Sequence, residues 1–233
     1  YKQKLQRAEE EAVKNQKTRD IALVAQNLPH FVYCKKDSSL SRGFEIVSMP
    51  ASFRWWKNNK DFVEEQILSL RKIGYRSFDT TTCGIHIHMD KNRFNPTDIQ
   101  KLHDFFRYNP GFILMVSQRE QKHLERWAGI YNPGDAKVYF KSINKRGGME
   151  RHVAINMNPE KTIEIRIFRG TLNTKSFYKN IEFCEALYLF IKEVETGECA
   201  LENFLKFVIF HKEKYENLFD FLKDRSMFIG DGA

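Results

Sequence analysis

The sequence predicts an α+β fold with a largely antiparallel sheet. Two short segments, residues 83–88 and 162–171, alternate their side chains as strands do. Helical patterns lie between and after them, without the regular strand–helix alternation that builds a parallel sheet. The chain has 233 residues, of which 42% are hydrophobic, including 20 Phe and 9 Tyr. This is enough for a single domain over residues 1–233 with a full core.

The N-terminal quarter predicts a helix followed by a strand pair. Residues 1–27 carry a charged helical pattern, and Pro29 ends it because proline cannot continue helical hydrogen bonding. Residues 30–36 and 42–48 are predicted strands. Asp37-Ser38-Ser39 supplies the turn between them.

The middle of the chain predicts three helices and a loop. An amphipathic helix covers residues 61–74, with Gly74 just past its C-terminal cap. A second helix begins at Asn95-Pro96-Thr97, and a third covers residues 112–127. Residues 129–149, which include a Gly-Gly pair, predict a mobile loop that could close over substrate. The alternative is an ordinary surface loop.

Two further helices are predicted after the second strand, over residues 176–196 and 201–223. The latter forms most of a C-terminal helical appendage, residues 197–233.

Composition indicates where in the cell the protein is expected. No run of 18 apolar residues exists, so no membrane span is expected, and the first residues lack the apolar stretch of a secretory signal. The four cysteines (Cys34, Cys83, Cys184 and Cys199) show no Cys-x-x-Cys spacing, so free thiols are expected rather than a disulfide framework or a zinc site. Both observations favour a cytoplasmic location.

The net charge of +8 suits polyanionic partners such as nucleotide phosphates, nucleic acid or an acidic substrate. The lysines fall largely among glutamates on helix faces, a pattern typical of a solvated surface. A nucleic-acid partner is therefore not favoured.

The two strand segments predict a polar floor on one face of the sheet. His86 and His88 lie two residues apart and point to one face, and the same holds for Glu164 and Arg166. The intervening isoleucines point to the other face and would enter the core. Imidazole, carboxylate and guanidinium together suit a divalent cation and a phosphate.

These segments resemble known motifs. Gly-Ile-His-Ile-His, residues 84–88, is similar to the Gly-x-His-x-His strand of glutamine synthetase-like carboxylate–amine ligases, and Ile-Glu-Ile-Arg, residues 163–166, is similar to their Glu-x-Arg strand. The longer run over residues 162–190 resembles the amidoligase family of that superfamily, many of whose members are phage-encoded. Further blocks at residues 37–48, 117–119 and 151–156 follow in the family's order, so that the resemblance spans roughly residues 33–192.

The resemblance implies a curved, mainly antiparallel sheet with the site on its concave face. It implies that His86, Glu164 and Glu45 ligate metal and that His88 contacts the phosphates of ATP. Arg166 would stabilise the transferring phosphate, because its planar fork matches phosphate oxygens.

Three more residues follow from the same resemblance. Arg169 would add a second positive group at the end of its strand, and Arg151 would contact phosphate or substrate. Asn156 would contact the nucleotide, or would simply pair with a neighbouring backbone group.

Simpler interpretations of the same residues exist. The two histidines could be hydrogen-bonded polar groups on an exposed sheet face. Glu164 and Arg166 could form an ion pair of the kind common on sheets, and Glu45 could face solvent.

The sequence departs from the family in one respect. Superfamily members begin with a Glu-x-Glu strand whose carboxylates help to hold the metals, and nothing before Asp37 has that pattern. Either the chain lacks its true start or it is a degenerate member that has lost catalysis.

The expected function is an ATP- and Mg²⁺-dependent ligase, with Mn²⁺ as a possible substitute, that joins a carboxylate to an amine through an acyl phosphate. The acceptor could be a peptide, a cell-wall precursor, a polyamine or a protein side chain. The oligomeric state is open, and for a phage-encoded protein the location would be the host cytoplasm.

Two alternatives belong to other classes. A His-hydrophobic-His nicking endonuclease would use His86 and His88 to hold a metal and Tyr178 or Tyr215 to attack single-stranded DNA. A non-catalytic amidoligase-like module could serve as a structural part of a phage particle.

Overall fold

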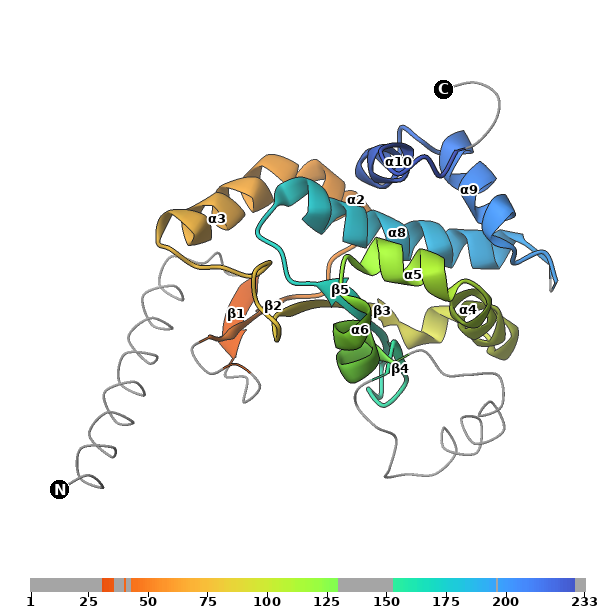
Figure 1. Cartoon of the computed structure of the whole chain (residues 1–233), viewed down its shortest axis with the longest axis horizontal. Coiled ribbons are helices and arrows are strands. Elements are labelled where there is room, and N and C mark those ends of the chain that lie inside the picture. The colour runs from red at the N-terminus through yellow and green to blue at the C-terminus, as the bar shows by residue number, and fades with distance from the viewer. Residues whose placement is uncertain (1–30, 36–39, 41–42, 130–152, 196, 229–233) are drawn as a thin grey trace. The chain divides into compact units, whose positions relative to one another are not determined.

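The computed structural model of the chain describes residues 31–35, 40, 43–129, 153–195 and 197–228. They form an α+β fold with two small antiparallel sheets (Figure 1). The helix expected over residues 1–27, the turn at 37–39 and nearly all of the loop expected at 129–149 lie outside the described residues.

The chain divides into two compact units, Tyr1–Arg76 and Ser77–Ala233. A compact unit is not necessarily an independently folding domain. The expectation of a single domain over residues 1–233 therefore stays a prediction.

In its described residues, the first unit contains a strand pair and two helices. Strand β1 (Val32–Lys35) pairs antiparallel with β2 (Glu45–Ser48), inside the ranges predicted for the two strands. Helices α2 (Phe53–Asn58) and α3 (Lys60–Lys72) follow. Aromatic rings from these elements pack against one another: Phe31, Trp55, Trp56 and Phe62.

Helix α3 ends where the sequence predicts. The N–H of Gly74 donates to Arg71 O at 3.0 Å and that of Tyr75 donates to Leu70 O at 3.1 Å, the paired bonds of a Schellman motif. Gly74 has φ +88°, a left-handed conformation that glycine adopts without a Cβ penalty. Its predicted place just past the cap is confirmed.

Within the second unit, the described residues form a three-stranded antiparallel sheet in the order β3-β5-β4. The strands are β3 (Gly84–Asp90), β4 (Ile155–Asn156) and β5 (Thr162–Arg169). The central strand, β5, has its isoleucines at 163, 165 and 167 at most 1% exposed. The predicted pairing of the two segments and the burial of the β5 isoleucines are therefore confirmed, whereas Ile85 and Ile87 of β3 are only half-buried.

Helices make up most of the rest of the second unit. They are α4 (Pro96–Tyr108), α5 (Pro110–Ser117), α6 (Gln121–Ala128), α8 (Thr174–Glu193), α9 (Leu201–Phe210) and α10 (Glu216–Lys223), and a short 3₁₀ turn, η1 (Lys91–Arg93), follows β3. Helices α5 and α6 contact β5, while α8 contacts α4, α9 and α10 (Figure 1). Phenylalanine rings form the centre of the core: Phe105, Phe112, Phe168, Phe183, Phe190 and Phe204.

The start of α4 follows its sequence signal. Asn95 accepts the N–H of Asp98 at 2.9 Å, and the Asp98 carboxylate accepts the N–H of Asn95 at 2.8 Å. This reciprocal capping box, followed by Pro96 in the first turn, confirms the predicted helix start.

The single helix predicted over residues 112–127 is wrong, because α5 and α6 are separate. Gln118 has φ 57°, a left-handed conformation that ends α5. Arg119 follows it and is only 9% exposed. The break turns this guanidinium inward against the sheet, which a continuous helix would not do.

The single helix predicted over residues 201–223 is also wrong, because turns at residues 211–215 separate α9 from α10. The carboxylate of Glu182, on α8 and 0% exposed, accepts the N–H of Leu218 at 2.8 Å and the side-chain amide of Asn217 at 2.7 Å. It thereby satisfies backbone and side-chain donors in the first turn of α10. These hydrogen bonds hold the start of α10 against α8. The chain has to turn between α9 and α10 for α10 to reach Glu182.

A second charged group is buried beneath the sheet. Lys179 is 1% exposed, donates from Nζ to Val116 O at 2.5 Å near the end of α5, and lies over the ring of Phe221. Burial, with a smaller contribution from the charge of Arg225, lowers the pKa of Lys179 to about 7.

Among the described residues, no helix combines the length and apolar character needed to cross a bilayer.

Candidate functional site

An irregularity in the β3–β5 pairing shapes the candidate site. Ile85 pairs with Phe168 and Ile87 pairs with Ile165, so that two steps along β3 face three steps along β5. The extra residue in β5 is a β-bulge.

The bulge decides which side chains share a face. His88 lies opposite Glu164, and Gly84 lies opposite Arg169. His88 and Gly84 are four residues apart and share a face, and so their partners do too. On a regular strand, Glu164 and Arg169 would point to opposite faces because five residues separate them.

A buried carboxylate lies at the centre of this face. Glu164 is 5% exposed, and its Oε1 lies 2.7 Å from Arg166 Nη1 and 3.0 Å from His86 Nδ1. Its Oε2 accepts a 2.6 Å hydrogen bond from the side-chain amide of Asn156 on β4. His88 Nε2 is 3.7 Å from Oε1. The structure therefore brings together five of the predicted site residues, from all three strands.

The surroundings of Glu164 keep its carboxylate charged. Burial by itself would raise the pKa of Glu164. The hydrogen bond from His86, the charge of Arg166 and the hydrogen bond from Asn156 outweigh that effect and lower the pKa to about 2. The carboxylate is thus an anchor for the surrounding donors and a very weak base.

His88 is the more exposed of the two imidazoles, with its side chain 48% exposed. Its Nδ1 lies 2.9 Å from Thr162 Oγ1 at the start of β5. The other ring nitrogen faces the carboxylate of Glu164, so the ring stands at the edge of the cluster.

Arg169 is held at the other end of β5. Its Nε donates to Phe78 O at 2.7 Å, and its guanidinium lies over the ring of Phe78, 3.8 Å from the ring centre. These contacts fix the cation at the end of the polar face.

Arg119 lies in this region and was not among the predicted site residues. Its Nε donates to Ile167 O at 2.9 Å and its Nη2 to Phe168 O at 3.0 Å. Burial lowers its pKa to about 10, with further contributions from the charges of Arg166 and Arg169. The only signal was the Ser-Gln-Arg block at residues 117–119, which does not reveal a contact with β5.

The structure does not place two predicted site residues relative to this cluster. Glu45 lies on β2 of the first unit, where its carboxylate is 3.7 Å from Lys35 Nζ. Arg151 lies outside the described residues. The proposed roles of both stay predictions.

The described residues do not by themselves fit a complete Mg²⁺ site. Within the described ranges, no group of three or more His, Cys, Asp or Glu side chains is arranged to hold a metal ion. Both oxygens of Glu164 already accept from N–H donors, whereas Mg²⁺ prefers about six oxygen ligands.

The charge balance of the face suits an anion. One carboxylate, Glu164, pairs with the guanidinium of Arg166, and the charges of Arg166 and Arg169 also act on Arg119. Arg166 Nε is buried and has no hydrogen-bond partner among the residues that the structure describes. Arginine forks and imidazoles of this kind bind phosphate oxygens.

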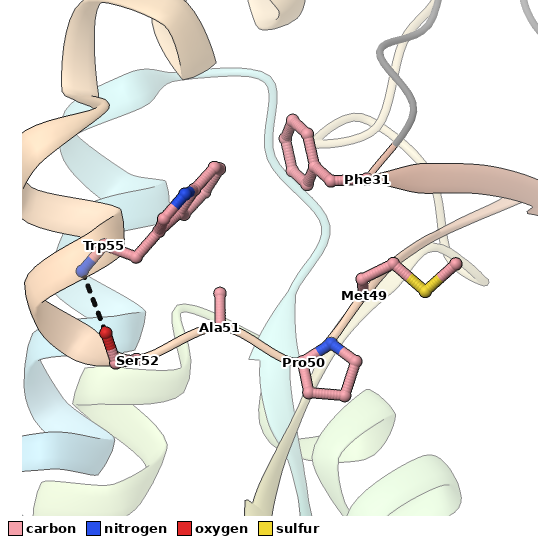
Figure 2. Close-up of a pocket in the computed structure, with 6 residues that line it drawn as sticks. All are labelled: Phe31, Met49, Pro50, Ala51, Ser52 and Trp55. Carbon is pink, nitrogen blue, oxygen red and sulfur yellow. Dashed lines mark hydrogen bonds between the residues drawn. The ribbon is translucent and has the colours of Figure 1, made fainter.

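A separate small pocket lies in the first unit (Figure 2). Its volume is about 270 Å³. The lining is Phe31, Met49, Pro50, Ala51, Ser52 and Trp55, with Ser52 Oγ accepting the backbone N–H of Trp55 at 3.1 Å. None of the predicted site residues lines it, and its mainly apolar walls offer no chemistry for phosphate.

Compared with protein-family models, curated proteins and solved structures, the chain matches none of them.

Proposed function

We propose that the chain is an ATP- and Mg²⁺-dependent ligase that joins a carboxylate to an amine, on a curved sheet of the glutamine synthetase-like kind. The observation that supports this most is the cluster around Glu164, in which His86, Arg166 and Asn156 meet one buried carboxylate. The motifs that resemble the family's Gly-x-His-x-His and Glu-x-Arg strands supply these same residues.

The reaction has two steps. A substrate carboxylate oxygen attacks the terminal phosphorus of ATP, the bond to ADP breaks, and an acyl phosphate forms. The amine nitrogen then attacks the acyl carbon, phosphate leaves, and the nitrogen loses a proton. Because phosphoryl transfer is catalysed mainly by positioning and charge neutralisation, the protein needs fixed positive groups more than a covalent nucleophile.

Arg166 and Arg169 are the proposed positive groups. The ion pair of Arg166 with Glu164, at 2.7 Å, holds its guanidinium in one orientation, and Phe78 does the same for Arg169. Preorganised charges of this kind stabilise a transferring phosphate without reorganising during the reaction. His88, at the exposed edge, would contact the phosphates of ATP.

Glu164 would act as an orienting group. With a pKa of about 2 it is too weak a base to accept the proton of the amine. His86 and Glu164 would help to hold a divalent cation, which would supply neutralisation of phosphate charge. The requirement for Mg²⁺ derives from the family resemblance, since the described side chains supply only part of a metal site.

The test is release of ADP that depends on an amine. Purified protein would be mixed with ATP, Mg²⁺ and pools of carboxylates and amines, and ADP would be measured by a coupled assay. We expect ADP only when both co-substrates are present, and Arg93→Lys, an exposed exchange, should behave as wild type. ADP release at the same rate with and without the amine would contradict the proposed ligase activity.

The alternatives make different predictions. The nuclease requires a tyrosine that reaches DNA, and Tyr178 and Tyr215 are both 0% exposed. Metal-dependent cleavage of single-stranded DNA that is lost with one of these tyrosines would nevertheless favour it. A non-catalytic module would show no heat of ATP–Mg²⁺ binding in isothermal titration.

A further inference from the structure

We infer that Arg119 is a positioning residue that holds Arg166 and Arg169 on one face of β5, an inference that rests on the proposed function. Arg119 lies between α5 and α6 and has no place in the cluster around Glu164. Its contacts are instead with the backbone of the strand that carries the two site arginines.

The contacts of Arg119 are specific to a bulged strand. Its Nε and Nη2 donate to the carbonyls of Ile167 and Phe168, two consecutive residues, at 2.9 and 3.0 Å. In a regular strand, consecutive carbonyls point to opposite sides, so one guanidinium could not donate hydrogen bonds to both. The fork of Arg119 therefore recognises β5 only in its bulged form.

The bulge is what turns Arg169 toward the site. Arg166 precedes the two carbonyls held by Arg119 and Arg169 follows them. If the extra residue were absorbed into regular pairing, Arg169 would turn to the isoleucine side. By donating to the carbonyls of Ile167 and Phe168, Arg119 stabilises the bulge and so keeps Arg166 and Arg169 on the same face of the sheet.

Arg119 is placed at an electrostatic cost. It is 9% exposed, and the nearby charges of Arg166 and Arg169 both oppose its own. A third guanidinium that only filled space would be disfavoured here, because burying a like charge is unfavourable. The two bonds to β5 offset this cost, and an apolar side chain such as Met could not make them.

The surrounding chain is adapted to Arg119. Gln118 takes the left-handed conformation that redirects the backbone, and Ser117 Oγ accepts the N–H of Arg119 at 3.0 Å. Gly84 on β3 lies so close that a Cβ there would overlap Arg119 Nη2. Backbone and side chains from three elements thus accommodate this one guanidinium.

The experiment compares Arg119→Lys and Arg119→Met with Arg71→Lys, an exposed exchange in the first unit. Circular dichroism would establish that each variant folds. If Arg119→Met does not fold, Arg119→Lys carries the test. The Nε–H resonances of Arg166 and Arg169 would then be followed by ¹⁵N NMR, since Arg169 Nε donates to Phe78 O and reports its position.

We expect the Arg169 Nε–H to shift and to exchange faster with solvent in both Arg119 variants, and not in Arg71→Lys. In the ligase assay, Arg119→Met should lower kcat by about a hundredfold with a smaller change in KM for ATP, because misplacing a catalytic group by about 1 Å has that effect. Arg119→Lys should retain more activity, because one of the two carbonyl contacts can be kept.

The outcomes separate the two ideas. Folded variants whose Arg166 and Arg169 resonances match wild type would overturn the positioning role, whatever the activity. Shifted resonances with unchanged kcat would overturn it as well. If wild type releases no amine-dependent ADP, the ligase fails, while the NMR comparison still decides whether Arg119 positions the two arginines.

Discussion

Asn156 and Glu164 face each other across the β4–β5 pair, and the side-chain amide of Asn156 donates to Glu164 Oε2 at 2.6 Å. The side-chain oxygen of Asn156, Oδ1, accepts the backbone N–H of Asn158 at 3.0 Å, which fixes which way the amide points. The carboxylate is therefore held from β4 on one side and by His86 and Arg166 on the other. Its charge, more than its shape, organises the site.

Glu164→Gln should remove a pH-dependent part of the free energy of unfolding. The folded pKa of about 2 lies below the ordinary value of 4.5, so the charged carboxylate contributes stability above pH 4.5 that is lost as the pH falls toward 2. We expect the free energy of unfolding of wild type to exceed that of the variant by about 1–3 kcal/mol at pH 6. This difference should shrink as the pH falls from 4.5 toward 2. Urea unfolding at several pH values measures it.

Glu160→Gln is the matched control, because Glu160 is exposed on the turn before β5. The free energy of unfolding of Glu160→Gln should stay close to that of wild type at every pH measured. A Glu164→Gln difference that is constant with pH would contradict the charged role of the carboxylate.

Gly84→Ala should destabilise the second unit. The new Cβ would overlap Arg119 Nη2, whose guanidinium is held by two carbonyls and cannot easily move. Overpacking of this kind costs about 1–3 kcal/mol. In a double-mutant cycle with Arg119→Met, the two effects should be strongly non-additive. Gly111→Ala, where a Cβ meets no atom within 4 Å, should be neutral or slightly stabilising, and additivity at Gly84 would refute the close approach.

Lys179→Met should alter the alkaline dependence of stability. The folded pKa of about 7 lies below the unfolded value of 10.5, so the unfolded chain binds more protons between these two values. Wild type should therefore gain stability relative to the variant as the pH rises from 7 to 10. Chemical denaturation at both pH values tests this, with the exposed Lys175→Met on the same helix as control. An equal pH response in wild type and Lys179→Met would exclude a depressed pKa.

Glu182→Gln should loosen α10. The carboxylate accepts from Leu218 N and from the Asn217 side chain, and a neutral amide replaces one acceptor with a donor. A loss of about 1–3 kcal/mol is expected, as for other buried hydrogen bonds left unsatisfied. Hydrogen exchange of the α10 amides would show the effect locally. Glu185→Gln on the same helix, whose carboxylate lies 3.6 Å from Lys214 Nζ at a partly exposed position, should cost much less.

Arg166→Lys should separate binding from catalysis in the proposed ligase. A lysine keeps the charge but cannot present the planar fork that Glu164 orients at 2.7 Å. We expect kcat to fall by about 10²–10³-fold, the usual effect of removing one preorganised donor. KM for ATP should change less. Retention of full activity by a folded Arg166→Lys would remove Arg166 from the mechanism.

The local patterns of the sequence predicted much of this site. Alternation of side chains is a property of each strand by itself, so the shared face of His88 and Glu164 followed from spacing once the strands paired. Caps are equally local, and Gly74 and Asn95 stand where their signals indicated. Glutamine synthetase-like curvature was implied only by resemblance and stays a prediction.

The features that sequence did not predict depend on contacts between distant segments. The bulge adds one residue to β5 without any special residue type, and Arg119 is directed by carbonyls 48 and 49 positions away. The break at Gln118 uses neither glycine nor proline. The break after α9 is explained by Glu182, a residue on another helix.

The bulge also makes the length of β5 a constraint in its own right. Side chains alternate between the two faces of the sheet on either side of the bulge, but the extra residue shifts this alternation by one position. Deleting Ile167 would keep every side chain type that the motif requires, yet would turn Arg169 toward the apolar core. Relatives of this chain should consequently tolerate substitution in that segment far better than a change in its residue count.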